Sequence, residues 1–271
     1  MNTLDALRRD VLAASLPPAL RDLHVNYRYL LAWAKAVSAR RPGARTLDFG
    51  CGPGLVVRSA RSLGLDLVGA DVFYGGEEDR KEVVAAGLLG TAVQEIRGGR
   101  IPFGDAAFDL VLSNQVFEHV EDLDATLAEL ARVMKGDALL VALFPTQEVV
   151  REAHCGVPFL HWVPRERRLA HAMRWSRWGS AFRKEQRSRE DWAREATAWV
   201  DRYVFYRGRA EILSAFRRRF EIVSAEEHYL AYRMPRPALA PLLRVPWARE
   251  AARRVCRRFN GVVLLGRKRS S

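Results

Sequence analysis

Residues 46–55, TLDFGCGPGL, decide the fold of this chain. The first four form a short apolar run typical of the end of a buried strand, and residues 55–63 have the pattern of a helix start. Between them, Gly50, Gly52 and Gly54 recur where a Cβ would block the turn or a ligand's approach to the backbone. A strand, a glycine turn and a helix in this order place backbone N–H groups around one polar ligand.

The spacing of these glycines excludes two common ligand classes. A dinucleotide fingerprint requires G-x-G-x-x-G, but only Pro53 separates Gly52 from Gly54, and Leu55 follows. No G-K-[ST] follows the loop, so a phosphate-cradling P-loop is excluded as well.

What remains is Asp-x-Gly-x-Gly-x-Gly, from Asp48 to Gly54. This pattern resembles the first motif of the class I S-adenosylmethionine-dependent methyltransferases. The resemblance implies that Asp48 helps to hold the methionine amino end of the cofactor S-adenosyl-L-methionine. It also implies that the loop contributes Gly50, Cys51, Gly52 and Gly54 to the cofactor site.

Two further segments match the same family in the same order. Residues 65–71, LDLVGAD, form a strand-like run that ends in Asp71, 23 residues after Asp48. An acidic residue at this distance, at the tip of the second strand, is placed to accept the ribose hydroxyls of a nucleoside; Val72 follows it. Residues 101–120, IPFGDAAFDLVLSNQVFEHV, resemble the fourth strand of the family and the turn before it.

Ligands of open parallel sheets bind beyond the carboxyl ends of the strands. By resemblance, the third tip (Gln94 and Glu95) holds the adenine edge, and the fourth tip (Asn114 and Gln115) lies near the transferring methyl. The family usually has an Asp at the third tip, and this chain does not.

Three histidines are candidates for the catalytic base. His119 follows the fourth strand at the cofactor mouth, where a neutral imidazole could deprotonate an acceptor hydroxyl or, alternatively, orient the loop. His154 and His161 belong to HCGVPFLHWVP, and either could bind the acceptor or act as the base. The spacing of His154, Cys155, His161 and His171 matches no paired metal-ligand motif, so no metal is expected.

Strand and helix patterns alternate from residue 44 to 145 and predict an α/β fold. The resemblance makes it a doubly wound, mostly parallel, seven-stranded Rossmann-like sheet. We expect a helical cap at 1–43, the cofactor-binding half at 44–145, a substrate lid inserted after the fifth strand at 146–206, and the rest of the sheet at 207–271. The cap has two predicted helices, and the second carries an apolar stripe from Leu20 and Leu23 through Tyr27 to Val37. The predicted strands are 44–50, 65–71, 91–96, 108–114, 138–145, 220–225 and 261–268. A helix is predicted at 122–135, after the fourth strand, with Gly136 at its end.

The charge is divided unevenly along the chain. Residues 1–150 carry 16 Lys and Arg against 20 Asp and Glu, whereas residues 151–271 carry 28 against 12. A basic half is typical of proteins with an anionic partner, or it is simply a solvated face. Residues 247–259 form a basic amphipathic helix that either contacts an anionic membrane surface or packs on the domain. Its apolar side chains share one face, and its arginines, which include Arg253 and Arg257, share the other.

Other sequence features concern location. No apolar run of 18 residues and no secretory leader is present, and the three scattered cysteines are typical of a reducing cytoplasm. We therefore expect a cytoplasmic protein, with the inner face of the membrane as a peripheral site.

The expected function is methyl transfer to a small-molecule or glycan- or lipid-linked acceptor, at oxygen. Within the family, the chain resembles the type 11/12-like branch, which includes bacterial enzymes of small-molecule and glycan pathways. Two alternatives stay open: an RNA or protein methyltransferase that uses the basic half, although nucleic acid is disfavoured, and a silent cofactor-binding subunit.

Overall fold

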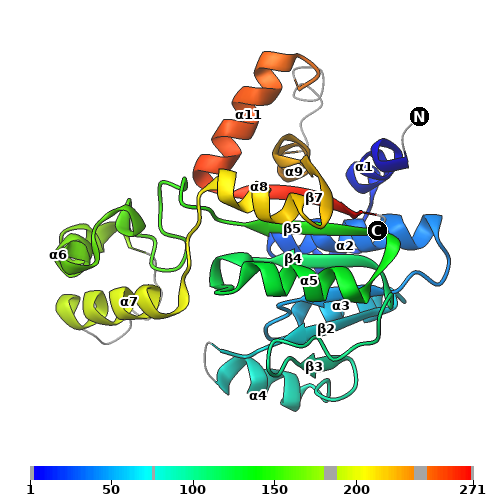
Figure 1. The fold of residues 1–271 in the computed structure, drawn as a ribbon, viewed down its shortest axis with the longest axis horizontal. Helices are drawn as coiled ribbons and strands as arrows, with labels where there is room; N and C mark the ends of the chain where they lie inside the picture. The colour runs from blue at the N-terminus through cyan, green and yellow to red at the C-terminus, as the bar shows by residue number, and fades with distance from the viewer. Residues whose placement is uncertain (1–2, 75–76, 180–187, 235–242, 270–271) are drawn as a thin grey trace.

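The computed structural model describes residues 3–74, 77–179, 188–234 and 243–269. Its centre is a seven-stranded sheet in the order β3-β2-β1-β4-β5-β7-β6 (Figure 1). The first five strands in the chain pair in parallel, and β7 is antiparallel to both of its neighbours, so six of the seven strands run in one direction. The α/β, mostly parallel fold predicted from the sequence is therefore confirmed. The strands are β1 (Thr46–Phe49), β2 (Leu67–Asp71), β3 (Val93–Glu95), β4 (Phe108–Asn114), β5 (Met134–Phe144), β6 (Phe220–Ser224) and β7 (Val262–Lys268).

The sheet is covered by helices on both faces, which is why its central strands are apolar on both sides. One face packs against α1 (Thr3–Ala13), α2 (Val25–Arg40), α3 (Leu55–Ser62), α4 (Glu77–Ala85) and α9 (Glu226–Arg233). The other packs against α5 (Leu123–Val133) and α8 (Arg209–Arg217). Alternate residues of β4 separate accordingly, with Leu110 and Leu112 on the first face and Val111 on the second.

Several helix boundaries differ from the sequence prediction. The second N-terminal helix begins at Val25, where the His24 side chain accepts a hydrogen bond from the Asn26 N–H, so Leu20 and Leu23 precede it. Gly136, predicted to end the helix after the fourth strand, instead lies within β5, because the chain extends directly from Met134. The helices α4 and α9 were not predicted from the sequence.

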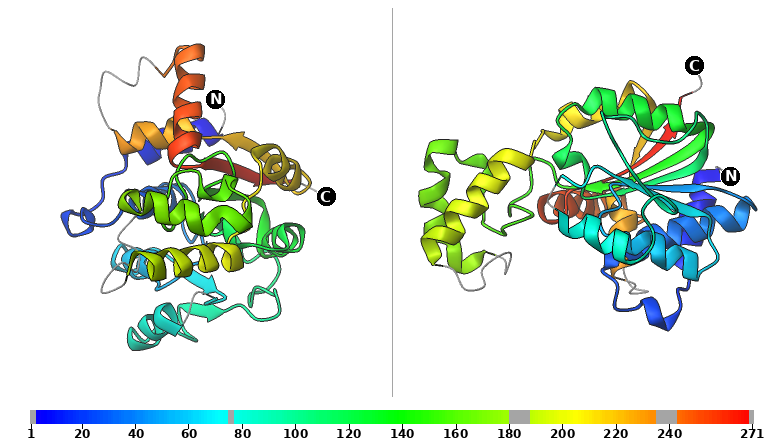
Figure 2. Two further views of the ribbon diagram at one scale, coloured as in Figure 1. Left: turned by 90° about the vertical axis from the view of Figure 1, so that its left-hand side faces the viewer. Right: turned by 90° about the horizontal axis from the view of Figure 1, so that it is seen from below.

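The segment after β5 folds away from the sheet. Helices α6 (Arg165–Trp175) and α7 (Arg189–Tyr203) lie against each other at one end of the molecule (Figures 1 and 2). They share a small apolar core of their own, which includes Leu160, Ala172 and Trp192. Residues 180–187 of the predicted lid lie outside the described part of the chain.

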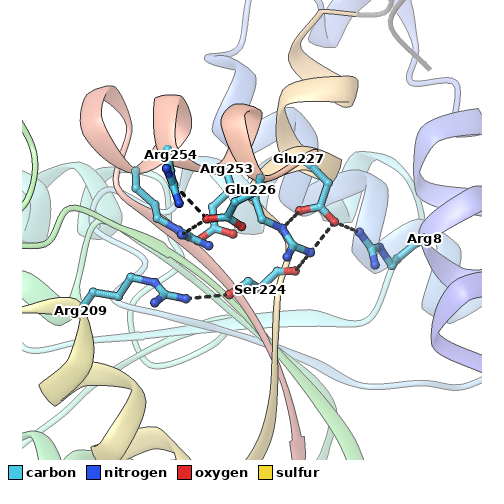
Figure 3. Close-up of polar contacts among 9 residues, drawn as sticks. Arg8, Arg209, Ser224, Glu226, Glu227, Arg253 and Arg254 are labelled. Atoms are coloured by element: carbon cyan, nitrogen blue, oxygen red, sulfur yellow. Dashed lines mark hydrogen bonds and ion pairs between the residues drawn. The ribbon is translucent and has the colours of Figure 1, made fainter. Parts of the chain in front are cut away.

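Helix α11 (Pro246–Phe259) packs on α9 through charged groups (Figure 3). Arg253 donates to both carboxylate oxygens of Glu227, at 2.7 and 3.0 Å, and Arg257 donates to Glu226 at 2.8 Å. Arg8 of α1 donates to the same Glu227 at 2.8 Å. The sequence had placed these arginines on the helix face opposite the packed one; the structure corrects this, because buried carboxylates of α9 draw Arg253 and Arg257 inward.

None of the helices in the described part of the chain is both long and apolar enough to span a bilayer.

Candidate active site

A cleft of about 440 Å³ opens at the carboxyl ends of the parallel strands. The strand tips and the glycine loop form one wall, and residues following β4 and β5 complete it. Of the residues predicted from the sequence, ten line the cleft: Asp48, Gly50, Cys51, Gly52, Asp71, Val72, Asn114, Gln115, His119 and His154.

The glycine loop is held in a shape that only glycine tolerates. Gly50 has a φ of +74°, and a Cβ there would stand 2.2 Å from Cγ2 of Val116. Gly54, with a φ of +75°, precedes α3 as its N-cap and faces apolar side chains behind the loop rather than the cleft. The loop therefore approaches the fourth-strand segment closely and brings the helix N-terminus to the cleft.

Asp71 at the tip of β2 is tied to the backbone around it. Its Oδ2 accepts a hydrogen bond from the Gly52 N–H at 2.8 Å, and its Oδ1 accepts one from the Phe73 N–H at 2.7 Å. Phe73 has a left-handed φ of 52°, an unfavourable backbone conformation for a non-glycine residue. Burial raises the pKa of Asp71, and these backbone hydrogen bonds partly oppose the increase. The residue thus joins the glycine loop to the second strand tip.

Asp48 is the most deeply placed carboxylate of the cleft, with 3 % of its surface exposed. Burial, together with the nearby Asp71 charge, raises its pKa to about 7. A buried carboxylate of this kind would be stabilised in its ionised form by a cationic ligand group such as an ammonium.

The fourth strand tip is fixed by long-range hydrogen bonds. Asn26 of α2 donates to Asn114 Oδ1 at 2.8 Å, and the Tyr229 hydroxyl of α9 donates to Asn26 Oδ1 at 2.5 Å. Gln115 follows with a φ of 57° and donates its N–H to the Leu143 carbonyl at 2.7 Å. Phe73 and Gln115, two non-glycine residues with left-handed backbone, therefore line the same cleft.

The third strand tip differs from the prediction in its contacts. Neither Gln94 nor Glu95 lines the cleft; Ile96 does. Glu95 is engaged instead by Arg97 at 3.0 Å and Arg80 at 3.7 Å, which lower its pKa. The adenine role of Gln94 and Glu95 stays a prediction, and Ile96 offers an apolar surface beside it.

Two histidines from different segments line another part of the cleft, called the histidine wall below. His119 ends the short 3₁₀ helix η2 (Phe117–His119), and His154 lies in the loop after β5. Their Nε2 atoms are 3.1 Å apart. His119 Nδ1 donates to the Tyr203 carbonyl at 2.7 Å, and His154 Nδ1 donates to Glu152 Oε1 at 2.7 Å. Burial lowers the pKa of His119 to about 4, with a smaller contribution from His154.

His161, the third candidate, lies elsewhere. It is 7 % exposed, and its Nε2 donates to the Gln147 carbonyl at 3.2 Å, while its ring contacts Tyr206 at 4.5 Å between centroids. It does not line the cleft.

Comparison with known proteins identifies the ligand class of the wall formed by the glycine loop and the strand tips, called the cofactor wall below. Residues 47–142 match the family model described as a methyltransferase domain. The chain contains a class I S-adenosylmethionine-dependent methyltransferase domain.

Relatives of this methyltransferase domain include ubiquinone biosynthesis O-methyltransferases. That of Mesorhizobium japonicum is 32 % identical over 132 residues, which cover 47 % of this chain and 53 % of that protein. That of Brucella ovis is 32 % identical over 133 residues, covering 47 % and 54 %. The chain thus spans about half the length of the curated relatives it matches. An S-adenosylmethionine-dependent methyltransferase structure from Mesorhizobium loti is 18 % identical, with 88 % and 97 % coverage and a TM-score of 0.48, a likeness too low to carry an argument.

S-adenosylmethionine is the cofactor that this family uses, and the residues of the cleft fit it. Asp48 offers a buried carboxylate for an ammonium group, and Asp71 offers a carboxylate at the tip of the second strand for hydroxyls. Val72 and Ile96 supply apolar surface suited to a flat base.

Three aromatic residues that complete the methyltransferase cleft were not assigned to it from the sequence. Tyr74 lies 4.9 Å from His119 between ring centroids, and Trp199 lies 4.7 Å from His154. Tyr27 also lines the cleft, while its neighbour Tyr29 is fully buried in the core. The helical stripe that contains Tyr27 was visible in the sequence, but nothing there distinguished its pocket side from its core side.

A second cleft of about 490 Å³ adjoins the methyltransferase cleft. The two share Tyr27, Asn114 and Gln115, and the second extends past Tyr229 to Phe259 at the end of α11. It provides room for an acceptor next to the fourth strand tip.

Proposed function

We propose that this protein transfers a methyl group from S-adenosylmethionine to an oxygen of a small-molecule or glycan- or lipid-linked acceptor. The observation that carries the proposal is the pair His119–His154, which lines the same cleft as the carboxylates Asp48 and Asp71. The names of the curated relatives, which are O-methyltransferases, support oxygen as the acceptor atom.

The cofactor supplies a methyl group on a cationic sulfonium, which reacts by direct displacement. The protein's own residues must then align the acceptor, exclude water and handle a proton. Asp48 and Asp71 hold and orient the cofactor end of the cleft. Tyr74 and Trp199 cover the histidines with apolar ring surface, which limits water at the reacting atoms.

The histidine pair is where the acceptor hydroxyl loses its proton. With Nδ1 committed to the Tyr203 carbonyl, His119 presents an Nε2 lone pair, and its lowered pKa keeps the ring neutral at pH 7. His154 is held in the same tautomer by Glu152, which also accepts from the Tyr206 hydroxyl at 2.9 Å.

The test combines turnover with cofactor binding. Purified protein is incubated with methyl-labelled S-adenosylmethionine and host extract separated into lipid, nucleic-acid, protein and small-molecule fractions. Label in the small-molecule or lipid fraction is expected, and label in RNA or protein would favour the alternative acceptors. Cofactor binding without label in any fraction would favour a silent subunit.

Variants of the histidine wall sharpen this test. His119→Ala and His154→Ala should each lower turnover about 100-fold, the usual contribution of acid–base assistance, with cofactor affinity near that of the wild type. His161→Ala, which removes a buried histidine outside the cleft, is the matched control. Equal turnover in all three variants would contradict the proposal.

We further propose that α11 contacts an anionic membrane surface, from which a lipid-linked acceptor would enter the second cleft. Its outer side carries Trp247, Val255 and Phe259, which are 71, 54 and 68 % exposed. The exposed Arg254 and Arg258 flank them, and positive charge beside exposed apolar groups is complementary to anionic lipid headgroups.

Co-sedimentation with vesicles tests this contact. Wild-type protein should bind phosphatidylcholine vesicles containing phosphatidylglycerol and not those without it. Replacing Trp247 and Phe259 by Ser should weaken binding about tenfold or more. Trp178→Ser, at a tryptophan that is 63 % exposed in the lid region, is the matched control; an equal loss there, or no loss in the double variant, would refute the contact.

A further inference from the structure

Three side chains at the edge of the methyltransferase cleft converge on one point. They are Glu118 and His119 of η2 and His154 of the loop after β5, and their nearest ligand atoms all lie within 4.8 Å of one another. Sequence spacing gave no metal motif here, because 35 residues separate the two histidines.

The hydrogen bonds of the two rings determine their tautomers. Tyr203 offers a backbone carbonyl to His119 Nδ1, so that nitrogen must carry a proton. Glu152 already accepts hydrogen bonds from the N–H groups of His154 and Cys155, at 2.9 and 2.7 Å, and acts as an acceptor toward His154 Nδ1. Both Nδ1 atoms are therefore donors, and in neutral rings both Nε2 atoms present lone pairs to each other at 3.1 Å.

Two facing lone pairs at this distance repel unless a positive species lies with them. Either one ring carries a second proton, which it shares with the other, or a cation binds to both nitrogens. Ligands about 2.1 Å from one metal ion and 3.1 Å from each other subtend roughly a right angle, which suits a coordination site.

Glu118 distinguishes these two cases. It is 2 % exposed, and within the described part of the chain no group donates a hydrogen bond to either carboxylate oxygen. Its Oε1 lies 4.0 Å from His119 Nε2. A buried carboxylate without a partner is costly to maintain, and a divalent cation would compensate it far more completely than a shared proton.

We propose that Glu118, His119 and His154 bind a divalent transition-metal ion, with Zn²⁺ as the best match. Two imidazoles and one carboxylate form a ligand set typical of such ions and leave coordination positions open toward the cleft. Tyr203 and Glu152 are the outer partners that orient the two rings, as the histidine ligands of metal sites require.

The proposed site deepens the proposed function and rests on it for its role in catalysis. An acceptor oxygen bound at an open position would lose its proton more readily, because the cation lowers the pKa of a bound hydroxyl. With a cation bound, the Nε2 lone pairs of both histidines would be ligands, so they would no longer act as the base. The acceptor would still lose its proton beside the histidine pair, but that proton would leave to solvent. Since His154 and Glu152 lie outside residues 47–142, the site joins the matched domain to a segment the family model does not cover.

Calorimetric titration of chelator-treated protein with Zn²⁺ tests the site without using activity. Wild-type protein should bind one ion tightly, and His119→Ala, His154→Ala and the isosteric Glu118→Gln should each bind it at least about tenfold more weakly. Glu152→Gln should cost about 10- to 100-fold through the orientation of His154. His161→Ala and His171→Ala, which remove lid histidines outside the cluster, should bind as the wild type does.

No stoichiometric binding by the wild type, or unchanged binding by His154→Ala or Glu118→Gln, would overturn the metal site and leave the shared proton as its replacement. Circular dichroism of each variant shows whether it is folded. A separate titration with S-adenosylmethionine keeps the two proposals apart. Cofactor binding without Zn²⁺ binding rejects only the metal site, whereas Zn²⁺ binding without cofactor binding rejects the proposed function.

Discussion

The two walls of the active-site cleft are built in different ways. The cofactor wall comes from the tips of neighbouring parallel strands, within residues 47–142, and its polar contacts connect nearby backbone, as between Asp71 and Gly52. The histidine wall joins His119 to His154 and, through them, to Tyr203 and Glu152 of the segment after β5. A family motif therefore describes the first wall and only one residue of the second.

This difference separates what is shared from what is particular to the chain. The cofactor wall would bind the same ligand whichever acceptor is methylated, so its chemistry is constrained. The second wall must suit an individual acceptor, and loops held on a rigid sheet are where such differences arise. Variants of the cofactor wall should accordingly alter S-adenosylmethionine affinity, and variants of the histidine wall should not.

The largest loss of cofactor affinity is expected from Gly50→Ala. The new Cβ would stand 2.2 Å from Val116 Cγ2 at a φ of +74°, so the loop must move. We expect affinity for S-adenosylmethionine, measured by calorimetry, to fall by about 100-fold or more and stability to fall by about 1–3 kcal/mol.

Gly43→Ala is the control for Gly50→Ala. Gly43 has a nearly equal φ of +77°, but a Cβ there has no neighbour within 4 Å. Gly43→Ala therefore measures only the cost of placing alanine in left-handed backbone. An equal loss of cofactor affinity in both variants would show that the fit of the loop against Val116 is unimportant.

A smaller loss is expected from Asp71→Asn. The amide nitrogen would face the Gly52 N–H or the Phe73 N–H, so one loop hydrogen bond is lost. The carboxylate oxygen predicted to accept a hydrogen bond from the ribose would be lost with it. We expect affinity to fall about tenfold or more, and unfolding in denaturant to show a loss of about 1–3 kcal/mol. Asp66→Asn, at an exposed position just before β2, should change neither quantity.

Asp48 links the cofactor wall to pH. Its raised pKa, about 7, means that the folded apo protein binds this proton more tightly than the unfolded chain does. The contribution of Asp48 to stability is therefore lost as pH rises from about 4 to 7, by an amount on the order of 3 kcal/mol. Asp48→Asn should remove that decline, as followed by denaturant unfolding at several pH values without cofactor.

Asp109 provides the opposite control for Asp48. It is equally buried, but Lys135 and Arg41 outweigh the effect of burial and hold its pKa below the usual value. Asp109→Asn should therefore destabilise the protein at neutral pH, with an effect that vanishes as pH falls through the carboxylate range. The same pH dependence in both variants would contradict the assignment of Asp48.

The smallest effect on affinity is expected at the third strand tip. Ile96→Ala removes apolar surface from the cleft and should weaken cofactor binding several-fold, about 1 kcal/mol. Gln94 does not line the cleft, so Gln94→Ala should change cofactor affinity less than about twofold. A tenfold loss in Gln94→Ala would instead support the adenine role predicted from the sequence.

Much of this molecule could be predicted from its sequence because the signals were local. The glycine loop, the strand that ends in Asp71 and the run ending at Asn114 each combine an apolar period with a marked turn. The end of the helix after β4 was misplaced because Gly136 is a common helix stop, whereas here the chain enters β5 at Met134 without a loop.

The rest depended on contacts between distant segments. Nothing near His154 in the sequence indicates that it meets His119, or that Trp199 covers both rings. The arginines of α11 were placed on its solvent side because charge usually lies there, but Glu226 and Glu227 reverse that preference.

The position of β7 has a consequence for how the chain is made. This strand, at the very end of the described chain, lies between β5 and β6, and β6 has no other partner in the sheet. During synthesis β6 leaves the ribosome about 40 residues before the strand it needs. The sheet edge at β5 stays open until β7 emerges, so until then a nascent chain is exposed to wrong edge pairing at β5.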